Sequence, residues 1–237
     1  MKKQTITLLA AFLLFTGRPQ AQTTAAAQPP ATQTTAAAWD STYRPATYGQ
    51  RLAQFKAYPN STKDVIFLGN SITAGVDWDE LLQLPTARNR GISGDITFGV
   101  LQRIDEVTEG HPAKVFILIG INDISRNIPD SVITANHERM IRAIQAASPK
   151  TAIYFQTLMP VNNNFTQHMA HYNKDQHIKA VNDGIKRLVA QYHLTLVDLH
   201  PHFLDKDGRL NADYTMDGLH LNEKGYQVWK SALKSYL

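Results

Sequence analysis

The amino-acid sequence predicts an α/β domain, a three-layer α/β/α sandwich around a parallel five-stranded sheet. Two observations carry this prediction. Short apolar runs recur along the chain without the polar alternation of half-exposed strands, which is typical of strands buried on both faces. Between them lie longer segments whose apolar residues repeat about every 3.6 residues, as in amphipathic helices. Such alternation of strands and helices indicates parallel strands joined by right-handed crossovers.

The expected strands are four clear apolar runs and one weaker run. The clear runs are DVIFLG (64–69), KVFILIG (114–120), AIYFQTL (152–158) and LTLVDL (194–199), and the weaker run is ARNRGI (87–92). In open parallel sheets, ligands bind at the carboxyl ends of the strands. The residues that directly follow these runs are therefore the first candidates for a functional site.

Helical periodicity is expected in five segments. They are YGQRLAQFKAYP (48–59), TFGVLQRIDEVTEG (97–110), SVITANHERMIRAIQAAS (131–148), residues 178–192, and EKGYQVWKSALKSYL (223–237). In the last segment we expect Tyr226, Trp229, Leu233 and Leu237 to lie on one packed side.

The first 38 residues have a different character. Lys2 and Lys3 precede an apolar segment and then small residues, which predicts a signal peptide over 1–21, with a second candidate cleavage point after Ala27. Residues 22–38 are of low complexity and are expected to form a linker. The remaining 39–237 would be a single domain, exported to the periplasm or secreted.

Charge and composition exclude several function classes. The chain has 24 Lys and Arg against 20 Asp and Glu. The first 38 residues hold Lys2, Lys3 and Arg18 and no acid, so the rest carries a net charge of only +1 (21 against 20). No basic block indicates a nucleic-acid surface. The absence of cysteine excludes disulfides, thiolate catalysis and a lipid-modified cysteine, so no stable membrane anchor is expected.

Groups suited to acyl transfer follow the expected strands. Ser71 follows the first run, Gly94 the weaker run and Asn122 the run at 114–120, while Asp217 precedes His220 by three residues. Taken alone, Ser71 is better explained as a helix cap, because serine is common at helix starts. The ordered set reverses this preference and predicts a nucleophile.

These five residues can fill every role in a serine hydrolase. A serine hydroxyl is a weak nucleophile until a base such as His220 takes its proton. Asp217 would hold His220 in the required tautomer and stabilise its cation. The N–H groups of Ser71 and Gly94 and the Asn122 amide would form an oxyanion hole, in which one donor is typically worth about 3–4 kcal/mol.

This combination resembles the SGNH hydrolase family, also called GDSL-type, over most of residues 63–237. The residues that match its signature are Ser71, Gly94, Asn122 and His220, and Asp217 matches its Asp-x-x-His block. The resemblance implies a flavodoxin-like fold. One departure is Asn70, which stands where GDSL has Asp; that Asp is not the triad acid, so the implied mechanism is unaffected. The Gly-x-Ser-x-Gly elbow of another hydrolase class is not matched, because position 73 is Thr.

The finer resemblance concerns the substrate. FLGNSITAGVDW, NRGISGDIT, IGINDI and DGLHLNEKGYQVW look like exported bacterial sialate O-acetylesterases and related carbohydrate acetylesterases, and acetylhydrolases of platelet-activating-factor type are similar too. We therefore expect removal of small acyl groups, chiefly acetyl, from a small-molecule or glycan ester, without cofactor or metal. The alternatives are a lipid or thioester hydrolase, an acyl transferase and a non-catalytic glycan-binding module, because fold alone does not select a substrate.

Candidate substrate contacts are Asp95, Arg126 and Asn162. Asp95 could instead organise the oxyanion loops, and Arg126 could be a solvated loop residue. The long polar segment 160–176 is expected to line the site. Its His168-x-x-His171 pair lacks an acidic third ligand at a telling spacing, so a metal site is not expected. DKDG (205–208) is better explained as a turn than as a calcium loop.

Overall fold

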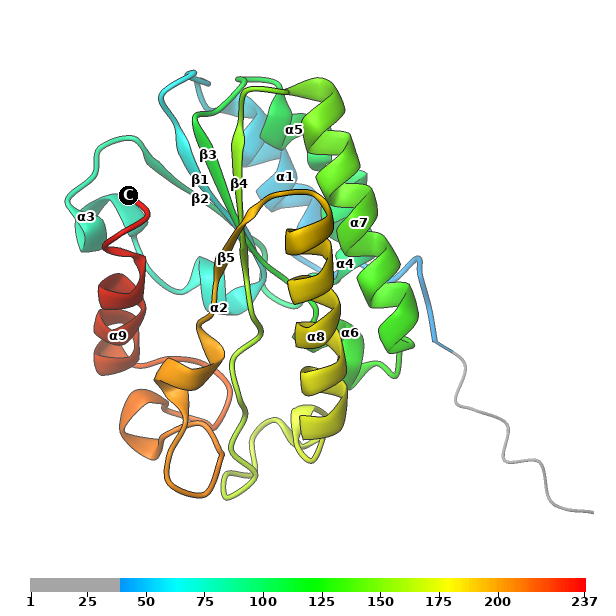
Figure 1. The fold of residues 1–237 in the computed structure, drawn as a ribbon, viewed down its shortest axis with the longest axis vertical. Coiled ribbons are helices and arrows are strands. Elements are labelled where there is room, and N and C mark those ends of the chain that lie inside the picture. The colour runs from blue at the N-terminus through cyan, green and yellow to red at the C-terminus, as the bar shows by residue number, and fades with distance from the viewer. Residues whose placement is uncertain (1–38) are drawn as a thin grey trace, which may run out of the picture. The chain divides into compact units, whose positions relative to one another are not determined.

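Five parallel strands form the centre of the structure, a computed structural model that describes residues 39–237 (Figure 1). Their order in the sheet is β2-β1-β3-β4-β5, the doubly wound order of flavodoxin-like folds. The strands are β1 (Val65–Gly69), β2 (Ala87–Gly91), β3 (Lys114–Leu118), β4 (Ala152–Gln156) and β5 (Thr195–Val197). The predicted sheet is therefore confirmed, the weak strand included. The predicted signal peptide and linker lie outside the described residues.

The register of the sheet brings the ends of its central strands to one level. Gly69, the last residue of β1, pairs with Gly91 of β2 and with Leu118 of β3. A Cβ atom at Gly69 would collide with the Leu118 carbonyl and with the side chain of Thr73. The chain can therefore turn sharply at this point, and the loops after β1, β2 and β3 start side by side.

Helices cover both faces of the sheet (Figure 1). They are α1 (Tyr48–Ala57), α2 (Ser71–Ala74), α3 (Trp78–Leu82), α4 (Thr97–Gln102), α5 (Ile104–Thr108), α6 (Ile121–Ser125), α7 (Asp130–Ala147), α8 (Asp175–Gln191) and α9 (Glu223–Leu233), with short 3-10 helices η1 (Met169–His171), η2 (His200–Phe203) and η3 (Ala212–Tyr214). None of the helices in residues 39–237 is long and apolar enough to cross a membrane.

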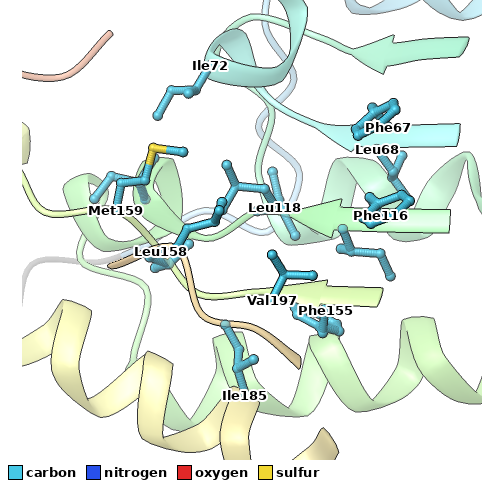
Figure 2. Packing of buried hydrophobic residues seen from close by; sticks show 14 of the residues in the cluster. Phe67, Leu68, Ile72, Phe116, Leu118, Phe155, Leu158, Met159, Ile185 and Val197 are labelled. Carbon is cyan, nitrogen blue, oxygen red and sulfur yellow. The ribbon is translucent and has the colours of Figure 1, made fainter. Parts of the chain in front are cut away.

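Aromatic side chains join α3 and α9 to one face of the sheet. The Phe67 ring stacks on Trp78 of α3 with centroids 4.0 Å apart and on Phe116 at 5.0 Å. The edge of Trp229, from α9, meets Trp78 at 4.8 Å. The opposite face of the sheet packs on α7 and α8, where Phe155 and Ile185 belong to one buried cluster (Figure 2).

Two predictions about helices are corrected by the structure. The segment 97–110 is two helices rather than one, because Arg103 leaves helical geometry and its fully buried guanidinium pairs with Asp95 at 3.0 Å. A buried charge needs such a partner. Leu237 does not join the packed side of α9, since the helix ends at Leu233 and Leu237 is 42% exposed.

Candidate active site

The candidate nucleophile lies where β1 turns into α2. Ser71 is the first residue of α2, and the cap is Asn70, whose Oδ1 accepts the Ile72 N–H at 3.0 Å. The helix start expected here is present, but the neighbouring residue performs the capping. The Asn89 amide holds the turn by donating to the backbone carbonyls of Thr73 (3.1 Å), Ala74 (3.3 Å) and Val76 (2.9 Å). Ser71 is therefore placed by its neighbours, and its hydroxyl is left for another partner.

That partner is His220. Ser71 Oγ lies 2.9 Å from His220 Nε2, and His220 Nδ1 lies 2.7 Å from Asp217 Oδ2. The other carboxylate oxygen, Oδ1, accepts the backbone N–H groups of Leu219 at 3.0 Å and His220 at 2.7 Å. The structure thus brings Ser71, His220 and Asp217 into one hydrogen-bonded row, although Ser71 and His220 are 149 positions apart.

The environment of Asp217 keeps its carboxylate ionised. Partial burial acts to raise the pKa, but the hydrogen bonds from the His220 side chain and from the His220 and Leu219 backbone outweigh it and lower the pKa of Asp217 to about 2. An ionised carboxylate can only accept hydrogen bonds, so the His220 nitrogen next to Asp217 Oδ2 must be the donor. His220 therefore carries its proton on Nδ1, which leaves Nε2 free to accept from Ser71.

The candidate oxyanion donors come from three successive strand ends. Gly94 has a φ of +79°, a conformation that favours glycine. The N–H groups of Ser71 and Gly94 donate to no other group within residues 39–237. Asn122, in α6, donates one amide hydrogen to the Asp95 carbonyl at 2.9 Å and keeps its second amide hydrogen free of the backbone. That these three groups together form an oxyanion hole stays a prediction.

Buried carboxylates hold the oxyanion loops together. Asp123 accepts from the Thr97 N–H at 3.0 Å and from the Thr97 hydroxyl at 2.5 Å. Burial raises the pKa of Asp123 to about 7, and the bonds from Thr97 partly oppose it. Burial likewise raises the pKa of Asp95, against the opposing effect of Arg103. Because Asp95 is fully buried, the prediction that it contacts substrate is wrong, and its organising role is the one observed.

The prediction for Asn162 also needs correction. Its side chain is 1% exposed and donates to the Leu210 carbonyl at 2.8 Å, so it is not available to a substrate. Its backbone N–H donates to the Gly218 carbonyl at 2.9 Å, which ties the segment 160–176 to the turn that carries Asp217. Asn162 therefore shapes the site without facing it.

Arg126 lies near the candidate site and is exposed to solvent. Its guanidinium stacks over the Tyr43 ring at 3.1 Å from the centroid. No carboxylate pairs with it within residues 39–237. The Tyr43 hydroxyl in turn would lie 3.5 Å from a Cβ atom built on Gly94. A cation that forms no ion pair with any carboxylate of residues 39–237 thus lies beside the oxyanion loops.

Two site residues were missed by sequence reasoning. His168 Nε2 lies 2.9 Å from Asp217 Oδ2, and His171 Nε2 lies 3.0 Å from Asn122 Oδ1. The signal in the sequence was the long polar segment 160–176, which was expected to line the site. His168 and His171 of this segment contact site residues. Among the described residues, His168, Asp217 and His220 have possible metal-ligating atoms within 4.8 Å of one another. The two histidines considered earlier as a pair of ligands therefore contact two different residues: His168 contacts Asp217 and His171 contacts Asn122.

A hydroxyl, an imidazole and a carboxylate in one hydrogen-bonded row are the groups that a hydrolase working through an acyl-enzyme needs. The model of the GDSL-like lipase/acylhydrolase family matches residues 67–228, and the chain belongs to this family. It is a carboxylic ester hydrolase.

Two known hydrolases similar in sequence to the chain agree with this assignment, and a solved structure shares its fold. The platelet-activating factor acetylhydrolase IB subunit alpha1 of Rattus norvegicus is 26% identical over 181 residues, 73% of this chain and 75% of the relative. An arylesterase of Vibrio mimicus is 32% identical over 121 residues, 45% of this chain and 60% of the relative. A solved structure of a GDSL-like lipase from Bacteroides thetaiotaomicron superimposes with a TM-score of 0.71, at 23% identity, over 80% of this chain and 96% of that chain.

Proposed function

We propose that the chain hydrolyses short acyl esters, chiefly acetyl esters, on carbohydrates. Ser71 Oγ attacks the ester carbonyl while His220 Nε2 takes the hydroxyl proton and passes it to the leaving alcohol oxygen. Water, deprotonated by His220, then attacks the acyl-enzyme and releases the acid and Ser71. The observation that carries this mechanism is the row of contacts from Ser71 through His220 to Asp217, at 2.9 and 2.7 Å.

The preference for a short acyl group is supported by a small cavity whose lining includes both sequence neighbours of Ser71. Its volume is about 10 Å³, roughly the space of one water-sized group. It is lined by Asn70, Ile72, Leu118, Ile121, Leu158, Met159, Pro160, Val161 and Leu219, of which Ile72, Leu118, Leu158 and Met159 are labelled in Figure 2. Members of this set directly precede or follow Ser71, Asn122 and His220. Because this space is so small, an acetyl group would displace its lining least, and a longer acyl chain would have to displace it more.

The preference for a carbohydrate is supported by the polar groups around the row. His168, His171 and the Asn-rich segment 160–176, apart from the buried Asn162, suit hydroxyl groups better than an acyl tail. Arg126 suits a carboxylate, such as that of a sialic acid, because a guanidinium matches a carboxylate with two parallel hydrogen bonds. An acetylated acidic sugar would use both features.

A lipid acetyl ester is the second candidate, favoured by the similarity to a platelet-activating factor acetylhydrolase. Rates on acetylated sialic acid, acetylated xylan and an acetylated ether phospholipid decide between them. The proposal expects the sugars to be hydrolysed faster, and a dominant rate on the phospholipid would overturn it. On p-nitrophenyl esters we expect activity to fall beyond about four carbons, whereas activity rising at eight or more carbons would exclude an acetylesterase.

A further inference from the structure

Two histidines of one short turn contact two residues of the candidate active site, the carboxylate of Asp217 and the amide of Asn122. His168 directly precedes η1 and bonds to Asp217, while His171 ends η1 and bonds to Asn122. Their rings lie edge to face with centroids 5.9 Å apart, and the His168 ring meets that of His220 at 4.9 Å. Two histidines three positions apart therefore connect Asp217 to the Asn122 amide of the candidate oxyanion hole.

The contact of His171 fixes the orientation of the Asn122 amide. Asn122 Nδ2 faces the Asp95 carbonyl, so the oxygen facing His171 is Oδ1, which can only accept; His171 Nε2 must be the donor. Burial, with the charges of His168 and His220 adding to it, lowers the pKa of His171 to about 4, so the ring is neutral near pH 7. Its buried Nδ1 has no partner within the described residues, as expected of the unprotonated nitrogen of this tautomer.

The Asn122 side chain is consequently held at both ends. The oxygen accepts from His171, and one amide hydrogen is given to the Asp95 carbonyl. Only the second amide hydrogen stays available, and it is the one an oxyanion needs. Donation to the amide oxygen also draws electron density from the amide nitrogen, which strengthens the remaining N–H as a donor.

The contact of His168 completes the coordination of Asp217. The carboxylate accepts two backbone N–H groups on Oδ1 and two imidazole groups, from His220 and His168, on Oδ2. Because both imidazoles share one oxygen, His168 competes with His220 for the same negative charge. His168 thus influences how strongly Asp217 attracts the proton on His220.

The turn that carries the two histidines is attached to the loop that contains Asp217. The Tyr172 hydroxyl donates to the Asp217 carbonyl at 2.6 Å and accepts the His168 N–H at 3.3 Å. Tyr172 is buried in the core. The Tyr172 side chain therefore ties the turn with the two histidines to the loop that carries Asp217.

We propose that His168 and His171 are positioning residues for ester hydrolysis, His171 orienting the Asn122 amide toward the oxyanion and His168 restraining the Asp217 carboxylate. This inference rests on the proposed function of Ser71, Asn122 and Asp217. In this proposal neither histidine contacts the reacting atoms; each acts through the residue to which it bonds.

The role of His171 is tested with His171→Leu and His171→Gln, since the glutamine amide nitrogen can replace Nε2 as a donor. On an acetyl ester we expect His171→Leu to lower kcat about 10- to 100-fold with KM little changed, less than the 10²–10³-fold loss typical of removing an oxyanion donor. His171→Gln should recover most of the activity. Equal losses in the two variants, or a loss only in KM, would overturn the role.

A double-mutant cycle separates positioning from a general structural defect. If His171 acts through Asn122, adding His171→Leu to Asn122→Ala should lower kcat no further. Full additivity of the two losses would refute the coupling. The double variant is compared with Asn122→Ala and not with the wild type. A loss of stability that is common to both enzymes therefore does not affect the comparison.

The role of His168 is tested by the pH profile of kcat/KM in His168→Leu and His168→Gln. Among the described residues, the ionisable or charged groups around this site are Asp217, His220, His171, Tyr172 and Arg126. Removing the donor should strengthen the attraction of Asp217 for a cation on His220 and move the acidic limb of the profile to higher pH. The glutamine variant should retain the wild-type limb. A wild-type limb in the leucine variant would overturn the role. If wild-type activity persists in Ser71→Ala, it is the proposed function itself that fails.

Discussion

At the scale of single residues, Asp217 is the carboxylate with the most hydrogen bonds in the candidate site. Its four donors and its pKa near 2 keep it negative at all working pH values. A charge that does not titrate can stabilise an imidazolium on His220 as the Ser71 proton moves. The charge matters more than the shape of this side chain.

Replacing Asp217 with Asn keeps the shape and removes the charge. We expect Asp217→Asn to lower kcat on p-nitrophenyl acetate by about 10³–10⁴-fold, because the amide favours the wrong tautomer of His220. Circular dichroism should show an unchanged fold. A loss of less than tenfold would show that Asp217 is not the acid of the row.

His137 couples stability to pH. It is fully buried and bonds through Nε2 to the Ile119 carbonyl, and burial lowers its pKa from 6.5 to about 4. The unfolded chain then binds a proton between pH 6.5 and 4 that the folded chain does not, so stability is lost as the pH falls through this window, by up to about 3 kcal/mol. His137→Gln should lose less stability between pH 7 and 4.5 than the wild type in urea titrations. Parallel losses would contradict the assignment.

Part of this residue-scale description could be predicted and part could not. Ser71, Gly94, Asn122, Asp217 and His220 were recognisable because each follows a strand or stands in a short motif. Asp95 and Asn162 were misassigned because exposure depends on packing, which spacing does not reveal. The roles of His168 and His171 were missed because no sequence motif shows that these loop side chains contact Asp217 and Asn122 in the fold.

At the scale of elements, the break between α4 and α5 supports the oxyanion loops. Arg103 pairs with Asp95 and also donates to the Gly69 carbonyl at the end of β1 at 3.1 Å. Apolar periodicity ran through both helices, so the sequence did not predict the break, which depends on a charge paired in three dimensions. One buried guanidinium thus connects the loops that carry Ser71 and Gly94.

Removing this guanidinium would leave Asp95 buried without its partner. We expect Arg103→Met to lower the free energy of unfolding by about 3–5 kcal/mol in urea titrations. The exposed pair of Lys56 and Asp105, 3.5 Å apart, is the matched control. Lys56→Met should be indistinguishable from the wild type. Equal effects of the two substitutions would show that the buried pair has no special role.

At the scale of the whole molecule, the order β2-β1-β3-β4-β5 brings distant segments of the chain to one edge. Ser71, Gly94 and Asn122 follow three adjacent strands, and the segment before α9 supplies Asp217 and His220. The sheet was predictable because buried parallel strands are continuous apolar runs. The short helices α2, α3 and α6 were not, because four or five residues are too few to show a helical period. Export of this domain remains a proposal, tested by the N-terminus of the mature protein.

The central claim is that Ser71 is the nucleophile of an acetylesterase. The most direct measurement compares acetyl ester hydrolysis by the wild type, Ser71→Ala and Ser231→Ala, the last removing a surface hydroxyl of α9. We predict that Ser71→Ala lowers kcat by at least about 10³-fold while Ser231→Ala matches the wild type. Activity of Ser71→Ala within tenfold of the wild type would contradict the account.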